Sequence, residues 1–127
     1  MRLGAEEKIQ AKIIAELHRR YECLVVHVPN GGYRSKTEAV RLKETGVTAG
    51  HPDLIVYRPG GRVYLMEVKA PGGSVSPAQK AFGSRLRRWA FDVAVVFSVE
   101  EALKAAQIWC LPPRREETAP EGVAVRF

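Results

Sequence analysis

Two strand-like segments joined by a short glycine turn are the strongest constraint on how this chain folds. Residues 53–57 read DLIVY, residues 63–68 read VYLMEV, and a Pro-Gly-Gly sequence at 59–61 lies between them. Apolar runs on either side of such a turn predict a β-hairpin. If residues 59–61 form a three-residue turn, Asp53 lies directly opposite Glu67. A two-residue turn would shift the register by one and place these carboxylates on different faces of the sheet.

The predicted hairpin also suggests a chemistry. Directly opposed residues on paired strands have Cβ atoms about 4.5–5.5 Å apart, so Asp53 and Glu67 could bind one divalent cation between them. Strand side chains alternate, so Lys69 shares the face of Glu67 while Val68 points into the core. A lysine there could help to activate water or stabilise charge on a phosphate. The pattern favours metal-dependent cleavage of a phosphodiester, against the alternative that Glu67 and Lys69 are ordinary exposed residues.

The remaining segments predict an α/β fold, a small mixed β-sheet flanked by helices. A helix is expected where apolar residues recur at helical spacing, and a serine before an amphipathic stretch indicates an N-terminal cap. The proline after Ser76 suits the first helical position. The expected elements, in the order α-β-(α)-β-β-α-β-α, are a helix at 5–20, strands at 24–28, 53–57, 63–68 and 93–97, a short helix at about 37–44, and helices beginning after Ser76 and Ser98.

The first helix offers a third carboxylate. At 100° per residue, Glu6 lies on the same stripe as Ile9 and Ile13, so we expect it on the buried side and in need of a partner such as a metal site. Glu7, about 100° away, is the alternative. Carboxylates in a first helical turn are also favoured by the helix dipole alone, which leaves a purely local role open.

Length and composition narrow the class of protein. The 127 residues suggest one domain, which we place at 1–110, with a proline-rich charged tail at 111–127 and a possible edge strand at 123–127. The net charge of +6 favours an anionic partner such as nucleic acid. Two cysteines without CxxC spacing are expected to be buried free thiols in a cytoplasmic protein. No apolar run reaches the length of a membrane span.

Basic residues around the expected site are candidates for contact with a DNA backbone. They predict salt-sensitive binding with little sequence preference. The loop at 30–32 could approach a phosphate closely, and Tyr33 could either stack on a base or pack internally. The candidates are Asn30, Tyr33, Arg34, Lys36, Arg41, Lys43, Lys80, Arg85, Arg87 and Arg88.

Several of these segments together resemble the virus-type replication-repair nuclease (VRR-NUC) domain, a branch of the PD-(D/E)xK nuclease superfamily with a restriction-endonuclease-like core. The resemblance covers nearly the whole chain to about residue 107. It is carried by the opening helix, the stretches VPNGGYRS and TGVTAGHPDLIVY, the strand and helix YLMEVKAPGGSVSPAQKAF, and the closing VAVVFSVEEAL. The G-x-P-D, E-V-K and S-P-x-Q pieces are specific in this order and spacing. His51 departs from the apolar or aromatic residue often found there; it could lie beside a metal or pack on the loop.

The resemblance implies a DNA nuclease dependent on Mg²⁺ or Mn²⁺, of the kind found as small phage and bacterial proteins. Its catalytic positions fall on Glu6 (or Glu7), Asp53, Glu67, Lys69 and Gln79. We expect Asp53, Glu67 and the Val68 carbonyl to bind the metal with support from Glu6, and Gln79 to steady Lys69 or the attacking water.

Stand-alone members of the family resemble junction-resolving enzymes, so branched DNA, including a four-way (Holliday) junction, and a homodimer are expected, with a role in replication, recombination or repair. Two alternatives remain. One is a sequence-specific restriction-type nuclease, and the other is a non-catalytic DNA-binding or assembly module.

Overall fold

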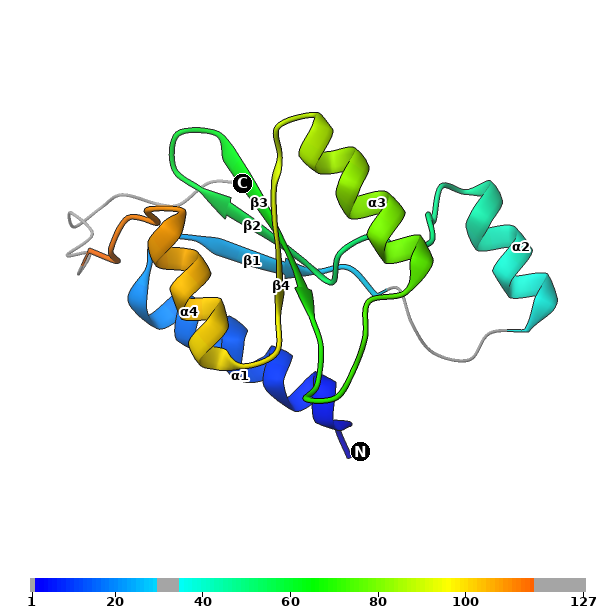
Figure 1. Ribbon diagram of the computed structural model, residues 1–127, viewed down its shortest axis with the longest axis horizontal. Coiled ribbons are helices and arrows are strands. Elements are labelled where there is room, and N and C mark those ends of the chain that lie inside the picture. Colours follow the sequence, from blue (N-terminus) through cyan, green and yellow to red (C-terminus); the bar gives the residue numbers. More distant parts are fainter. Residues whose placement is uncertain (1, 30–34, 116–127) are drawn as a thin grey trace, which may run out of the picture.

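The computed structural model describes residues 2–29 and 35–115 and has the predicted α/β architecture. Four helices and four strands alternate in the order anticipated from the sequence (Figure 1). Observed bounds lie within about two residues of the expected ones. The elements are α1 (Ala5–Arg20), β1 (Leu24–His27), α2 (Lys36–Glu44), β2 (Leu54–Arg58), β3 (Arg62–Val68), α3 (Pro77–Arg88), β4 (Asp92–Val96) and α4 (Val99–Ile108).

The strands form one mixed sheet in the order β1-β2-β3-β4. Strand β2 runs antiparallel to both β1 and β3, whereas β4 pairs in parallel with β3. Parallel neighbours need a crossover connection, and α3 supplies it between β3 and β4. As a result, α3 lies close to the C-terminal end of β3, where Glu67-Val68-Lys69 is found.

The hydrophobic core lies between one face of the sheet and helices α1 and α4, which lie side by side in Figure 1. Alternate residues of the strands point into it, including Leu54, Met66 and Val68, each fully buried. Burial of a side chain of this size contributes about 1.5–3 kcal/mol relative to exposure. Val68 therefore faces the core as predicted, and its neighbours Glu67 and Lys69 point to the opposite face, where α3 lies.

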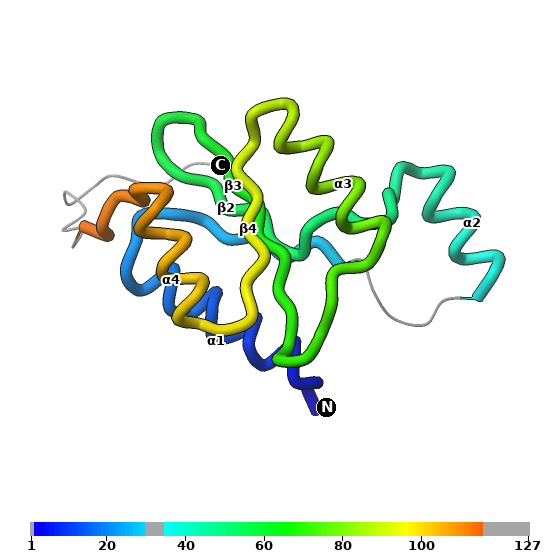
Figure 2. Tube along the Cα trace, in the orientation of Figure 1, coloured from blue at the N-terminus to red at the C-terminus, as the bar shows by residue number. Residues whose placement is uncertain are grey.

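Helix α2 stands apart from the packed layers. It projects from the long connection between β1 and β2, beyond α3 in the trace of Figure 2, and none of its residues is buried. Ser35 caps its first turn by accepting a hydrogen bond from the backbone N–H of Glu38 at 3.2 Å. Its basic residues are consequently open to solvent.

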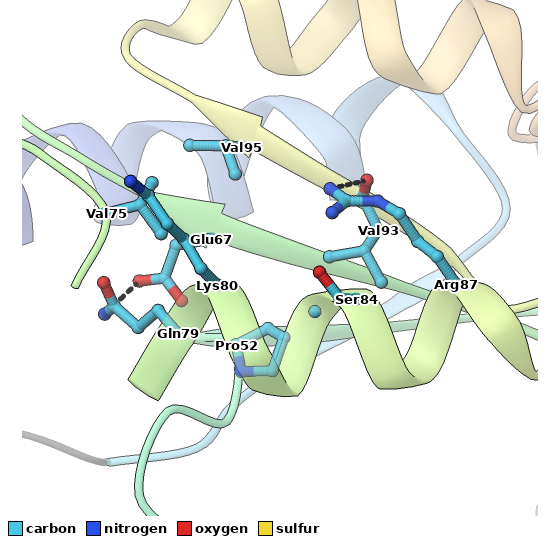
Figure 3. Close-up of a pocket in the computed structure, with 10 residues that line it drawn as sticks. Pro52, Glu67, Val75, Gln79, Lys80, Ser84, Arg87, Val93 and Val95 are labelled. Carbon is cyan, nitrogen blue, oxygen red and sulfur yellow. Dashed lines mark hydrogen bonds between the residues drawn. The ribbon is translucent and has the colours of Figure 1, made fainter. Parts of the chain in front are cut away.

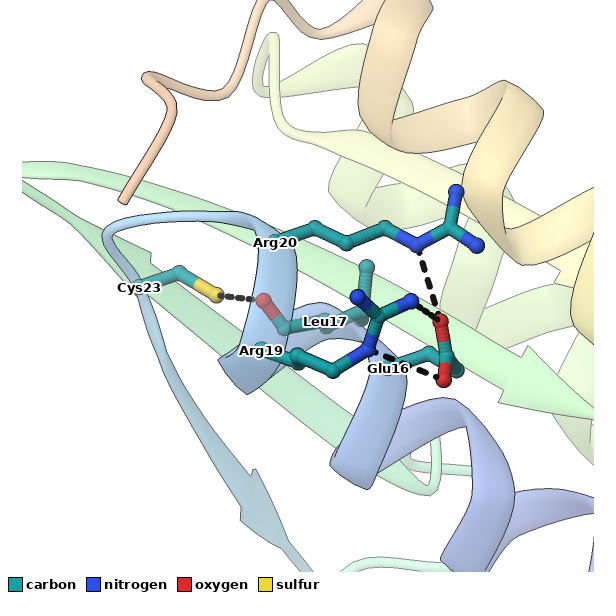
Figure 4. Close-up of polar contacts among 5 residues, drawn as sticks. All are labelled: Glu16, Leu17, Arg19, Arg20 and Cys23. Atoms are coloured by element: carbon teal, nitrogen blue, oxygen red, sulfur yellow. Dashed lines mark hydrogen bonds and ion pairs between the residues drawn. The ribbon is translucent and has the colours of Figure 1, made fainter. Parts of the chain in front are cut away.

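The end of α1 is held by local polar contacts in which one carboxylate pairs with two arginines (Figure 4). Glu16 accepts hydrogen bonds from Arg19 and Arg20 at 2.8 Å each, and these bonds lower the pKa of its carboxyl. The Cys23 thiol is half-buried and donates to the Leu17 carbonyl at 3.6 Å, and burial raises its pKa to about 11. Glu16 therefore offsets part of the positive charge at the end of α1.

Cys110 is exposed, although we expected both cysteines to be buried. It lies in the turn that ends α4 and has a left-handed backbone with φ of 55°.

The chain from Leu111 to Arg114 packs on the domain. Leu111 is in the core, and the Arg114 side chain donates to the His18 carbonyl at 2.9 Å. The proposed edge strand at 123–127 lies outside the described residues. No helix in the described ranges is long and apolar enough to cross a membrane.

Candidate active site

The β2–β3 hairpin has the register predicted from its turn. Arg58 pairs with Arg62 across a three-residue turn in which Gly60 and Gly61 take positive φ of 94° and 74°. The pairing runs back to Leu54 opposite Met66, which places Asp53 opposite Glu67 one residue before β2 begins. The odd-length turn is thus confirmed.

Asp53 is fixed at the end of the hairpin by two backbone contacts. Its carboxylate Oδ2 accepts a hydrogen bond from the backbone N–H of Val68 at 2.8 Å, and its carbonyl accepts from the backbone N–H of Val28 at 2.7 Å. The residue therefore links the ends of three neighbouring strands. Its carboxylate is directed at the Glu67-Val68-Lys69 segment, as a metal ligand beside Glu67 would have to be.

Glu67 is a buried carboxyl, with 3% of its surface exposed. Burial is the largest cause that raises its pKa, to about 9, followed by a hydrogen bond to the Asp53 carboxyl and by the charge of Asp53. The charge of Lys69 opposes the shift and that of Glu6 adds slightly to it. Two adjacent carboxylates repel each other when both are ionised, so the position beside Asp53 favours the protonated form of Glu67.

Lys69 continues the face of Glu67. Its Nζ lies 4.0 Å from Glu67 Oε1, and only 9% of the residue is exposed. The backbone N–H of Lys69 donates to the Val96 carbonyl at 2.9 Å, which extends the β3–β4 pairing to this point. A buried ammonium beside two carboxylates offsets part of their charge and remains able to donate hydrogen bonds to a third group.

Gln79 is held in one orientation by the cap of α3. Its side-chain carbonyl accepts from the Ser76 backbone N–H at 2.9 Å, while its own backbone N–H donates to Ser76 Oγ at 3.2 Å. This capping box leaves the amide Nε2 to donate to Glu67 Oε1 at 3.1 Å (Figure 3). The sequence led us to expect contact with Lys69 or a water. Instead Gln79 contacts Glu67, because the reciprocal cap fixes which end of the amide points toward β3.

The two glutamates in the first turn of α1, Glu6 and Glu7, make different contacts. Glu7 Oε1 accepts from the Gly4 backbone N–H at 3.2 Å and so serves the cap of α1. Glu6 is exposed, which corrects the expectation that it lies on the buried stripe: burial in α1 becomes complete only at Ile13, one helical turn or more further along. Glu6 nonetheless acts electrostatically on Glu67, and Glu7 is not among the causes of that shift.

A hollow of about 270 Å³ opens beside Glu67 (Figure 3). Glu67 and Gln79 form one part of its lining, and Lys80, Ser84 and Arg87 come from the next turns of α3. The Arg87 guanidinium donates to the Val93 carbonyl at 3.0 Å, which ties α3 to β4. The Glu67 carboxyl and the basic side chains of Lys80 and Arg87 therefore share one recess, an arrangement suited to a cation and a phosphate together.

His51 packs on α3. Its ring meets the Phe82 ring edge-on, with centroids 5.1 Å apart, and its Nδ1 lies 2.7 Å from the Pro52 carbonyl. In the described ranges, no cluster of three or more His, Cys, Asp or Glu side chains is close enough together to hold a metal ion. A cation would therefore rely on Asp53 and Glu67 with backbone oxygen or water.

Gly50 is a positioning residue that we did not identify from the sequence. It has φ of 86°, and a Cβ built on it would lie 2.3 Å from the Ala78 carbonyl oxygen. The loop before Pro52-Asp53 thus rests directly on the first turn of α3, which fixes Asp53 relative to Gln79. The available signal was a glycine three residues before the aspartate in a turn-like stretch.

Gly50→Ala is therefore expected to destabilise the protein by about 2–4 kcal/mol, because a left-handed alanine is strained and its methyl group collides with backbone. Any DNA cleavage should fall at least about tenfold as Asp53 shifts. Gly60→Ala is the matched control: it has a similar φ of 94° but nothing within 4 Å of the added Cβ. Urea denaturation should show a smaller loss for Gly60→Ala, and equal losses would contradict the role of the contact.

The candidate DNA contacts divide between two helices. Asn30, Tyr33 and Arg34 lie outside the described residues. Lys36, Arg41 and Lys43 are exposed on α2, and Lys80, Arg85, Arg87 and Arg88 are exposed on α3. Helix α3 carries no acidic residue, so all of its charged side chains are basic.

Comparisons with known proteins agree with the fold. A solved structure titled "VRR_NUC domain protein" aligns over 84% of this chain and 88% of its own, with a TM-score of 0.65 and 22% sequence identity, which establishes a shared fold. No curated protein matches. The VRR-NUC domain model matches residues 4–100, a range that contains all of the candidate catalytic residues. The chain belongs to the VRR-NUC family, which is a family of nuclease domains.

Proposed function

We propose that this protein is a metal-dependent DNA endonuclease that hydrolyses phosphodiester bonds and selects branched DNA. The observation that carries the proposal is the pairing of Asp53 with the buried carboxyl of Glu67, with Lys69 only 4.0 Å from the Glu67 oxygen. Burying the Glu67 carboxyl beside a second carboxylate costs free energy, and the packing of the apolar core does not depend on that burial. Family membership supports the nuclease chemistry.

The residues present fit a hard divalent cation, Mg²⁺ or Mn²⁺. Asp53 and Glu67 supply carboxylate oxygens and the Val68 carbonyl lies between Glu67 and Lys69 in the chain, which matches the oxygen preference of these ions. The charge of Glu6 also reaches Glu67, so Glu6 would support the cation through water. When bound, such an ion supplies Lewis acidity toward a phosphate oxygen and makes water more acidic.

The remaining residues position the reactants. Lys69 would donate a hydrogen bond to the attacking water or to a phosphate oxygen on which charge develops. Gln79 fixes the Glu67 carboxyl through its amide, and its own orientation is set by Ser76. Because the side chain of Glu67 is buried and clamped, it can present an oxygen without a large rearrangement.

The basic surface of α3 would bind the DNA backbone beside this recess. We expect the logarithm of the affinity to fall steeply and linearly with the logarithm of salt concentration. Arg88→Ala should reduce that slope by about 0.9, the change for one phosphate contact. Arg20→Ala is the matched control, because Arg20 is ion-paired with Glu16 and lies on α1, across the sheet from α3. Binding measured by fluorescence anisotropy over a salt series checks this; a slope near zero in the wild type would refute an electrostatic interface.

Cleavage of a labelled DNA panel tests the proposed function. The panel contains a four-way junction, a flap, a duplex and a single strand, each with Mg²⁺, Mn²⁺ or EDTA. We expect cutting only with a metal, and the junction or flap to be cut in preference to the duplex. Gel filtration with light scattering tests the expected homodimer. Salt-sensitive binding without cutting in any metal would favour the DNA-binding module instead.

A further inference from the structure

An exposed tryptophan ends α3 at some distance from the candidate catalytic residues. Trp89 is the C-terminal cap of the helix, and 60% of its surface is exposed. The Arg85 guanidinium lies over its ring, 4.9 Å from the centroid. This contact holds one face of the indole in place and leaves much of the side chain open to solvent.

The tryptophan borders a second hollow, of about 680 Å³, on the outer side of α3. Arg85, Arg88 and Trp89 line one part of it, and Phe82 with the loop residues Thr48 and Ala49 lines another. Its lining combines aromatic rings with two guanidinium groups, and no carboxylate is among the described residues that form it. Such a surface suits a ligand that is both flat and anionic, which is the character of a nucleotide with an unstacked base.

The distance along α3 between Trp89 and the candidate catalytic residues suits a strand of DNA. Gln79, at the start of α3, contacts Glu67, and Trp89 follows ten residues later at the end of the same helix. Ten residues of α-helix span about 15 Å. That is about four to five nucleotide steps of a stacked strand. A strand running along the basic helix could therefore have its phosphate at the carboxylates and a base at the tryptophan.

We propose that Trp89, oriented by Arg85, is a stacking site for an unpaired base of the DNA substrate, so that DNA with a single-stranded arm binds in preference to duplex. This inference rests on the proposed nuclease function and names the feature of the substrate that is selected. A paired base cannot use the site, because its faces are covered by its neighbours in the duplex.

The experiment compares binding of a flap and a matched duplex by Trp89→Ala and Trp89→Phe, in EDTA so that no cutting occurs. Trp89→Ala should lose about tenfold in affinity for the flap, the cost of one lost base stack, with a much smaller change for the duplex. Trp89→Phe keeps a flat ring and should retain most of the preference. A 2-aminopurine base in the flap should be quenched by the wild type and Trp89→Phe but not by Trp89→Ala.

Ile108→Ala is the matched control, since Ile108 is 74% exposed on α4 at the other face of the sheet. Equal flap and duplex affinities in the wild type, or an unchanged preference in Trp89→Ala, would overturn the inference and leave the proposed nuclease intact. A change from dimer to monomer in Trp89→Ala, with the flap preference unchanged, would overturn it in favour of a contact between copies. Absence of all DNA binding and cutting by the wild type would refute the proposed function as well.

Discussion

Asp53→Asn is expected to reduce metal-dependent DNA cleavage by about a thousandfold or more while the protein remains folded. Asparagine has nearly the same shape, and its side-chain carbonyl can still accept the hydrogen bond from the Val68 N–H that is 2.8 Å long in the wild type. The loss would therefore come from the missing negative charge beside Glu67. Cleavage of the labelled panel, with circular dichroism to check folding, measures both parts of the prediction.

Lys69→Met is the companion variant. Methionine keeps much of the apolar stem of the lysine but removes the ammonium 4.0 Å from Glu67 Oε1. We expect a similar loss of cleavage, because no other lysine or arginine is within salt-bridge distance of Glu67 in the described chain. Cutting at the wild-type rate by pure Lys69→Met protein would reject the lysine as a catalytic residue.

Glu67→Gln is expected to change stability and activity in opposite directions. The folded chain holds a proton on Glu67 more tightly than the unfolded chain, since the pKa rises from an ordinary value of 4.5 to about 9. Without metal, the free energy of unfolding should therefore fall as the pH rises between these values. Glutamine cannot lose a proton, and its amide can still accept from Gln79 and donate to Asp53.

In EDTA at pH 8, Glu67→Gln should therefore be more stable than the wild type by about 1 kcal/mol or more, which corresponds to a Tm increase of about 4 °C. At pH 5 the two proteins should differ much less, and the variant should cut no DNA. Thermal denaturation of both proteins at pH 8 measures the difference in stability, and the same measurement at pH 5 is the control. A variant that is less stable than the wild type at pH 8 would show that Glu67 is not under strain in the folded chain.

Local patterns in the sequence were sufficient for the hairpin and most of the elements. The bounds of α1 follow from periodicity, and the parity of a strand places Glu67 and Lys69 on one face. The turn length was open between two and three residues, and the three-residue turn was favoured because only that turn brings Asp53 opposite Glu67. The register of β2 and β3 depends only on the length of the turn between them. The approach of Asp53 to Glu67 could therefore be predicted before any tertiary contact was known.

The features of the site that the sequence did not reveal depend on where the helices begin relative to the sheet and on contacts between distant segments. Helical periodicity placed Glu6 on the buried stripe, but the first turn of α1 extends past the packed core, so Glu6 is exposed. The contact of Gln79 with Glu67 requires the reciprocal cap with Ser76. The close approach of Gly50 to Ala78 joins two segments 28 positions apart, and no local pattern encodes such a contact.

Binding of Mn²⁺ by isothermal titration calorimetry, with wild type, Asp53→Asn and Lys69→Met side by side, tests the central claim most directly. If Asp53 and Glu67 hold the cation, the wild type should bind it and Asp53→Asn should bind at least about tenfold more weakly. Lys69→Met should bind at least as tightly as the wild type, because it removes a positive charge, although it does not cut DNA. Equal Mn²⁺ affinity in Asp53→Asn and the wild type would contradict the metal site and the mechanism built on it.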